Sequence, residues 1–143
     1  MPKTFKTQRR VEFRDTDMAG IVHFSNFFTY MEQAEHEFLR SLGLAVIQVI
    51  DGEHVSFPRV NAQCNYRNAI KFEEIIDVEV SVSRIGKRSI TYQFQFSRDE
   101  TPVAEGSITV ACCRFENGMK PESIDTPASF VDLIRPFLVE QTD

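Results

Sequence analysis

The feature that most constrains this chain is a change in the period of its apolar residues. Between residues 27 and 42 the spacing is three or four, and the stripe consists of Phe27, Met31, Ala34, Phe38 and Leu42. This spacing predicts an amphipathic helix of about 17 residues. Ser25 or Asn26 is a suitable N-cap, and Gly43 is a suitable helix stop. Glutamates interrupt the stripe on what we expect to be the solvated side: Glu32, Glu35 and Glu37.

Later in the chain the period falls to two. Alternating apolar and polar residues occupy three segments: residues 76–83, 90–96 and 108–113. This pattern is typical of strands with one buried face. Turn residues separate the segments at Gly86-Lys87 and at Asp99 to Pro102. Each segment is therefore expected to be one strand of an antiparallel sheet.

The remaining segments are less regular. Residues 4–14 are predicted to form a first strand, and residues 55–67 another, interrupted near Pro58. Residues 45–54 are ambiguous and are compatible with a short helix. Asn117-Gly118 is a turn signal. A last helix is expected over residues 127–138, with Thr126 as its cap and Pro127 in its first position.

The order of these elements defines the fold class. One strand, one long helix and then a series of antiparallel strands indicate an α+β fold, in which the helix packs on one face of a five- to six-stranded sheet. The length of 143 residues and the ordinary share of apolar residues, 42%, fit one domain over residues 1–143.

Charge and cysteine content exclude several functions. The formal net charge is −5, so a general nucleic-acid-binding role is not expected, because phosphate contacts require clustered cations. The three cysteines show no metal-ligand spacing, and no metal site is predicted. Neither a signal peptide nor an apolar run long enough for a membrane span is evident. We therefore expect a cytoplasmic protein with reduced thiols.

The segment richest in chemical groups joins the first strand to the long helix. It reads Asp15-Thr16-Asp17-Met18-Ala19-Gly20-Ile21-Val22-His23-Phe24-Ser25-Asn26-Phe27. A pair of aspartates before a helix is also common among turn and cap residues, so Asp15 and Asp17 alone carry little functional information. No phosphate-binding loop, dinucleotide fingerprint or serine-nucleophile elbow accompanies it.

The whole segment resembles the signature of the 4-hydroxybenzoyl-CoA thioesterase family, which includes the Tol-Pal-associated acyl-CoA thioesterases. The matching residues are Asp15, Asp17, Gly20, Ile21, Val22, Asn26 and Phe27, and the similarity continues through the helix and the later strands. The resemblance implies a hotdog fold and hydrolysis of an acyl-CoA thioester. It also implies no cofactor beyond the CoA of the substrate, and assembly as a homodimer or homotetramer.

The resemblance assigns the catalytic carboxylate to Asp17, as a nucleophile or as a general base for water. We expect backbone N–H groups near His23, Phe24 and Ser25 to bind the developing oxyanion, because they lie at a helix N-terminus. Gly20 would permit a sharp turn. Asp15 is expected to shape the loop by hydrogen bonding to the backbone.

Further residues are candidates for binding the substrate: Gly20, Val22, His23, Phe24, Asn26 and Phe57. The Tol-Pal-associated members often have a Tyr at the position of His23 and a His one place later, so a catalytic role for His23 is disfavoured. Phe24 and Phe57 are candidates for an acyl tunnel, although most aromatic residues only fill a core.

The turn Gly86-Lys87-Arg88-Ser89 is the expected CoA-binding segment. In the family the matching region contacts CoA, and Lys87 and Arg88 suit phosphate groups. The same residues fit a solvent-exposed basic hairpin turn without a ligand equally well. Two other functions stay open: a hotdog dehydratase using His23 with Glu32 or Glu35, and a non-catalytic acyl-CoA-binding protein.

Overall fold

The computed structural model describes residues 1–116 and 118–139. Its elements follow in chain order: β1 (Phe5–Arg10), the 3-10 turn η1 (Phe13–Asp15), α1 (Asn26–Ser41), β2 (Ile47–Ile50), β3 (Glu53–Ser56), β4 (Arg59–Tyr66), β5 (Ile75–Ile85), β6 (Ser89–Arg98), β7 (Thr101–Ala111), β8 (Cys113–Arg114), β9 (Glu122–Ser123), α2 (Ala128–Ile134) and η2 (Arg135–Phe137). Within this described part, no helix is long and apolar enough to span a membrane.

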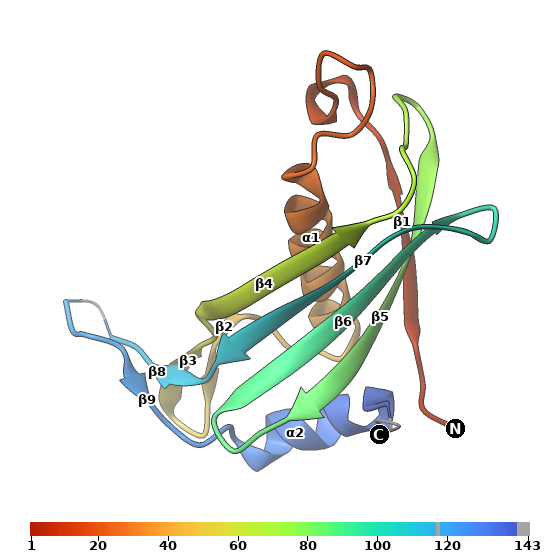
Figure 1. The fold of residues 1–143 in the computed structure, drawn as a ribbon. Coiled ribbons are helices and arrows are strands. Elements are labelled where there is room, and N and C mark those ends of the chain that lie inside the picture. The colour runs from red at the N-terminus through yellow and green to blue at the C-terminus, as the bar shows by residue number, and fades with distance from the viewer. Residues whose placement is uncertain (117, 140–143) are drawn as a thin grey trace.

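The main sheet has five antiparallel strands in the order β1-β5-β6-β7-β4. Helix α1 crosses one face of this twisted sheet (Figure 1). The inward positions of the alternating strands pair across the sheet, as Val80 does with Phe94, and both are fully buried. The predicted α+β architecture is confirmed, and the predicted helix stripe is buried from Phe27 to Phe38.

One close approach between helix and sheet depends on a glycine. A Cβ on Gly106 in β7 would lie 2.5 Å from Cε of Met31 and 2.8 Å from the carbonyl oxygen of Gln63. The backbone oxygen cannot move aside without disturbing the β4–β7 pairing. Met31 therefore packs directly against the β7 backbone.

We expect Gly106→Ala to lower the free energy of unfolding by about 1–3 kcal/mol, because the added methyl group overpacks this contact. Chemical denaturation measures the change. Ser107→Ala is the matched control, since Ser107 lies on the opposite face of the same strand and is half-exposed. Equal stability of the two variants would contradict a steric role for Gly106.

Residues 45–54 do not form a helix, contrary to one interpretation of the sequence. They form most of the hairpin β2–β3, which continues into a second antiparallel sheet of order β2-β3-β8-β9. The turn residues Asp51 and Gly52 both have positive φ, 52° and 80°. Two such residues in succession are the requirement of the tight turn that best matches strand twist.

The C-terminal helix is shorter than predicted. Helix α2 covers Ala128–Ile134, with Pro127 at the cap position, and η2 follows it. Thr126 does not cap the helix, because Pro127 holds the N-cap position and no side-chain cap hydrogen bond is formed. The predicted turn at Asn117-Gly118 lies partly outside the described residues, although Gly118 has a φ of 82°.

Candidate active site

The loop between β1 and α1 holds Asp17 in a tight turn. The Asp17 N–H donates to the carbonyl of Ile21 at 2.8 Å, and the Gly20 N–H donates to the carbonyl of Asp17 at 3.0 Å. Gly20 has a φ of 81°, a conformation that a residue with a side chain rarely adopts. The predicted sharp turn at Gly20 is therefore present.

The Asp17 carboxylate is only half engaged by its own loop. Its Oδ1 accepts a hydrogen bond from the Ala19 N–H at 2.8 Å, as in an Asx turn. Its Oδ2 has no hydrogen-bond partner among the described residues. One oxygen therefore fixes the side chain and the other remains available to react.

A cleft of about 340 Å³ opens beside this carboxylate. It is lined by Asp17, Ile21, Val22, Phe24, Phe27, Tyr66, Arg67, Asn68, Ala69 and Ile70. Three residues predicted for the site, Asp17, Val22 and Phe24, thus meet in one cleft. The segment from Tyr66 to Ile70 completes the wall; in it only Arg67 is a candidate from the sequence, as a cation contributed by a neighbouring subunit. Its Tyr66 hydroxyl donates to the carbonyl of Phe24 at 3.0 Å.

Of the three backbone N–H groups expected to bind an oxyanion, two are already occupied. The His23 N–H donates to the carbonyl of Asp15 at 2.8 Å, and the Ser25 N–H donates to Nδ1 of His23 at 3.3 Å. The Phe24 N–H has no acceptor within the described residues. Phe24 is therefore the backbone donor that a bound carbonyl oxygen can use.

His23 lies next to this cleft without lining it. Its Nδ1 is 2.7 Å from Oγ of Ser25, and its ring stacks on Phe24 with 4.7 Å between centroids. Ser25 occupies the N-cap position of α1 without a side-chain cap bond, because its hydroxyl is turned to His23 instead.

Asn26 does not line the Asp17 cleft, and its side chain makes a structural contact instead. Its Nδ2 donates to the carbonyl of Asp15 at 2.8 Å. Asn26 and Asp15 line a separate groove of about 610 Å³ between β1, η1 and α1. The Asp15 carboxylate accepts hydrogen bonds from the backbone N–H of Glu12 and from the hydroxyl of Tyr30, as expected for a residue that shapes the loop.

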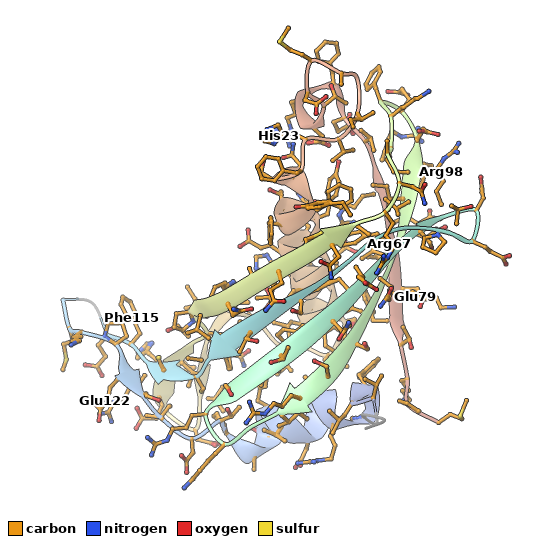
Figure 2. The ribbon with its side chains drawn as sticks, in the orientation of Figure 1. His23, Arg67, Glu79, Arg98, Phe115 and Glu122 are labelled. Carbon is orange, nitrogen blue, oxygen red and sulfur yellow. The ribbon has the colours of Figure 1, made fainter. Side chains whose placement is uncertain are left out.

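Phe57 lies in a different cleft, at the other end of β4. This second cleft has a volume of about 430 Å³ and is lined by Glu32, His36, Val46, Ile47, Ser56, Phe57, Pro58, Arg59, Phe115 and Pro121. In Figure 2, His23 lies at the upper end of α1, whereas Phe115 lies at the lower left, beside β8 and β9. A single chain does not bring Phe57 and Asp17 together.

Glu35 is buried beneath the second cleft and not solvated, contrary to the sequence interpretation. It is 0% exposed, and both of its carboxylate oxygens accept hydrogen bonds from the guanidinium of Arg59. Burial raises the pKa of Glu35 to about 7, although the neighbouring Arg59 opposes the rise. His36 is only half-buried, and its pKa is lowered, chiefly by burial. Neither glutamate predicted for a dehydratase, Glu32 or Glu35, contacts His23.

The Gly86–Ser89 turn is also remote from Asp17 in one chain. It follows β5, whose first residue, Ile75, pairs with Arg10 just before the Asp17 loop. The eleven residues of β5 separate the two ends by roughly 33 Å at the usual rise per strand residue. Arg88 Nε is 2.8 Å from Asp125 Oδ1, and Lys87 Nζ is 3.9 Å from Oδ2. These pairs lower the pKa of Asp125, mainly through the hydrogen bond from Arg88.

Within the described part of the chain, no group of three or more His, Cys, Asp or Glu residues is arranged to hold a metal ion. The cleft beside Asp17 offers a carboxylate, a backbone N–H group and a wall that is mostly apolar but includes Arg67 and Asn68. Such a set can activate water, or attack a carbonyl carbon directly, while the N–H binds the carbonyl oxygen.

A family model, related sequences and solved structures all indicate the same family. The family model described as the thioesterase-like superfamily matches residues 11–135. A protein of Aquifex aeolicus, provisionally named as an esterase, is 32% identical over 80% of this chain and 87% of its own length. An acyl-CoA thioesterase of Haemophilus influenzae is 25% identical over 72% of this chain and 76% of its own length.

A gentisyl-coenzyme A thioesterase of known structure is 26% identical in sequence. The two structures superpose with a TM-score of 0.79 over 91% of this chain and 99% of that one. The hotdog fold and the family resemblance predicted from the sequence are confirmed. With its fold and most of its length matched, this chain belongs to the thioesterase-like superfamily.

Proposed function

We propose that this protein is an acyl-CoA thioesterase in which Asp17 is the catalytic carboxylate. The observation that carries the proposal is that Asp17, with one available oxygen, and Phe24, with an unoccupied N–H group, line the same cleft. The thioester carbonyl oxygen would accept the Phe24 N–H, and negative charge would develop on it in the transition state. Relatives named as CoA thioesterases support this choice of substrate.

Two routes satisfy the chemistry. As a general base, Asp17 takes a proton from water, the hydroxide adds to the carbonyl carbon, and the C–S bond breaks as the proton passes to the departing thiolate. As a nucleophile, Asp17 adds to the carbon and expels the thiolate, and water then hydrolyses the mixed anhydride. Both routes yield a free acid and CoA.

We also propose that two copies of the chain pair through β4. The outer edge of β4 has no partner strand among the described residues, and its exposed side chains include Val60 and Tyr66, which are 62% and 46% exposed. No charged residue protects β4 between Val60 and Tyr66. The other open edge, β1, carries several cations, a usual means of preventing edge pairing.

Antiparallel pairing of two β4 strands would have a direct consequence for the site. It would place the Arg59 end of one strand beside the Tyr66 end of the other. The second cleft of one copy, with Phe57, would then adjoin the Asp17 cleft of its partner. The Gly86–Ser89 turn of the copy that contributes Phe57 would approach the same region, since Ile90, Val110 and Arg59 share one row of the sheet. Two such dimers can form the expected homotetramer.

The proposed CoA contact predicts a selective defect. Arg88→Glu is expected to raise KM for an acyl-CoA by about tenfold, because it replaces a phosphate-binding cation with an anion. The same acyl group on N-acetylcysteamine, which lacks phosphates, should be hydrolysed with unchanged KM. An equal change in KM for both thioesters would contradict phosphate recognition by Arg88.

Thiol release from a panel of aromatic, short branched and long-chain acyl-CoAs tests the function itself. We expect turnover of at least one member. Formation of an unsaturated acyl-CoA from a hydroxyacyl-CoA without thiol release would instead indicate a dehydratase. Tight acyl-CoA binding with no turnover would indicate a binding protein. The free thiols of the described cysteines fit the reducing cytoplasm that we propose as its location.

A further inference from the structure

Asp15 is the point at which the segments around the site are tied together. Its Oδ2 accepts hydrogen bonds from the Glu12 N–H at 2.9 Å and from the Tyr30 hydroxyl at 2.8 Å. Its carbonyl oxygen accepts the His23 N–H and Nδ2 of Asn26, both at 2.8 Å. One residue thus connects the end of β1, both ends of the Asp17 loop and the first turns of α1.

The two groups proposed to act on the thioester are close neighbours of this junction in the chain. Asp17 is two residues after Asp15. The Phe24 N–H belongs to the peptide that follows His23, and the His23 N–H is fixed by the Asp15 carbonyl. The orientation of both groups therefore depends on where Asp15 is held.

Tyr30 is the part of this network that comes from the rigid core. It lies on α1, is 3% exposed, and packs edge-on against Phe27 with 6.0 Å between ring centroids. Phe27 in turn lines the Asp17 cleft. Burial and, to a smaller extent, the Asp15 carboxylate raise the pKa of Tyr30. Its hydroxyl therefore remains a hydrogen-bond donor at any pH at which the enzyme would work.

We propose that the hydrogen bond from Tyr30 to Asp15 is a positioning device for catalysis, which sets the Asp17 carboxylate and the Phe24 N–H at the separation that the reaction needs. This inference rests on the proposed thioesterase function. Neither Tyr30 nor Asp15 lines the Asp17 cleft; both line the separate groove between β1, η1 and α1. A displacement of about 1 Å in such a pair of groups can lower a rate by as much as 10².

The test is Tyr30→Phe, which removes one hydroxyl and keeps the ring in the core. We expect kcat to fall about tenfold while KM changes less than threefold, since the substrate contacts remain in place. Tyr92→Phe is the matched control: it removes the hydroxyl of another buried tyrosine, on β6, whose ring packs edge-on against Phe38 in α1. The control should keep kcat within a factor of about two, and both proteins should be compared at matched thermal stability.

Two outcomes would overturn the inference. The first is an unchanged kcat in Tyr30→Phe, and the second is an equal fall in kcat in both variants. If Tyr30→Phe does not fold, Asp15→Asn provides the comparison, because it keeps the shape of the side chain but removes the charge that strengthens the hydrogen bond from Tyr30. Asp17→Asn separates this question from the proposed function: if that variant stays active, the function fails, whatever Tyr30 does.

Discussion

Asp17→Asn is expected to lower kcat for acyl-CoA hydrolysis by on the order of 10² or more. Asn has the shape of Asp and can still accept the Ala19 N–H, so the turn should persist. It cannot take a proton from water at neutral pH, and it is a poor nucleophile. The loss should therefore appear in kcat, while KM changes little. Steady-state thiol release and chemical denaturation of the same samples measure both quantities.

A matched control for this variant is Asp99→Asn. Asp99 lies in the exposed β6–β7 turn with a φ of 48°, a conformation that Asn tolerates well. It loses the same charge without touching the cleft. Full activity in Asp17→Asn would refute the catalytic assignment, and a matching loss in Asp99→Asn would attribute the effect to net charge.

Arg59→Met is expected to destabilise the fold at pH 8 by about 3 kcal/mol, because it leaves the Glu35 carboxylate buried without its partner. Arg98→Met is the control, since Arg98 forms a 2.8 Å ion pair with Glu74 at the surface. Surface pairs contribute little, so the control should lose less than about 1 kcal/mol. Urea denaturation of the two variants and of the wild type gives the comparison.

The pH dependence of this effect follows from the pKa of Glu35. Burial raises that pKa from 4.5 to about 7 in the folded protein, so the folded state holds its proton more tightly than the unfolded state. Protonated Glu35 therefore contributes to the free energy of unfolding. This contribution is complete below pH 4.5 and is lost as pH rises through 7. Removal of Arg59 raises the pKa further, and the defect should be smaller at pH 5.5 than at pH 8. An equal defect at both values would contradict a titrating Glu35.

Local patterns were sufficient to predict the elements that form the main sheet and its helix. The stripe from Phe27 to Phe38 and the alternation in β5, β6 and β7 each depend on one buried face, and such faces have a fixed period. The hairpin at Asp51-Gly52 was missed, although an Asp-Gly pair is a recognised hairpin signal, because its flanking strands are short and weakly alternating. Glu35 was misplaced because its partner, Arg59, is 24 residues away.

The candidate site was predictable only where it is local. Asp17, Gly20, Val22 and Phe24 belong to one continuous segment, and the structure places them around one turn and its cleft. The wall from Tyr66 to Ile70 and the Tyr30–Asp15 hydrogen bond depend on how distant segments pack. No short-range pattern in the sequence encodes those contacts. The roles of His23 and of the Gly86–Ser89 turn stay predictions.

The second cleft has implications for how substrate preference in this protein can diverge. Two of its residues, Phe57 and Arg59, also serve the fold: Phe57 packs against Phe130 in the core, and Arg59 holds Glu35. Mutations of Phe57 or Arg59 would therefore destabilise the fold. Ile47 and Phe115 line the same cleft but are 71% and 37% exposed. In the proposed dimer, where this cleft adjoins the Asp17 cleft of the partner, adaptation to a new acyl group would have its least constrained route through these two positions, because substitutions there need not destabilise the fold.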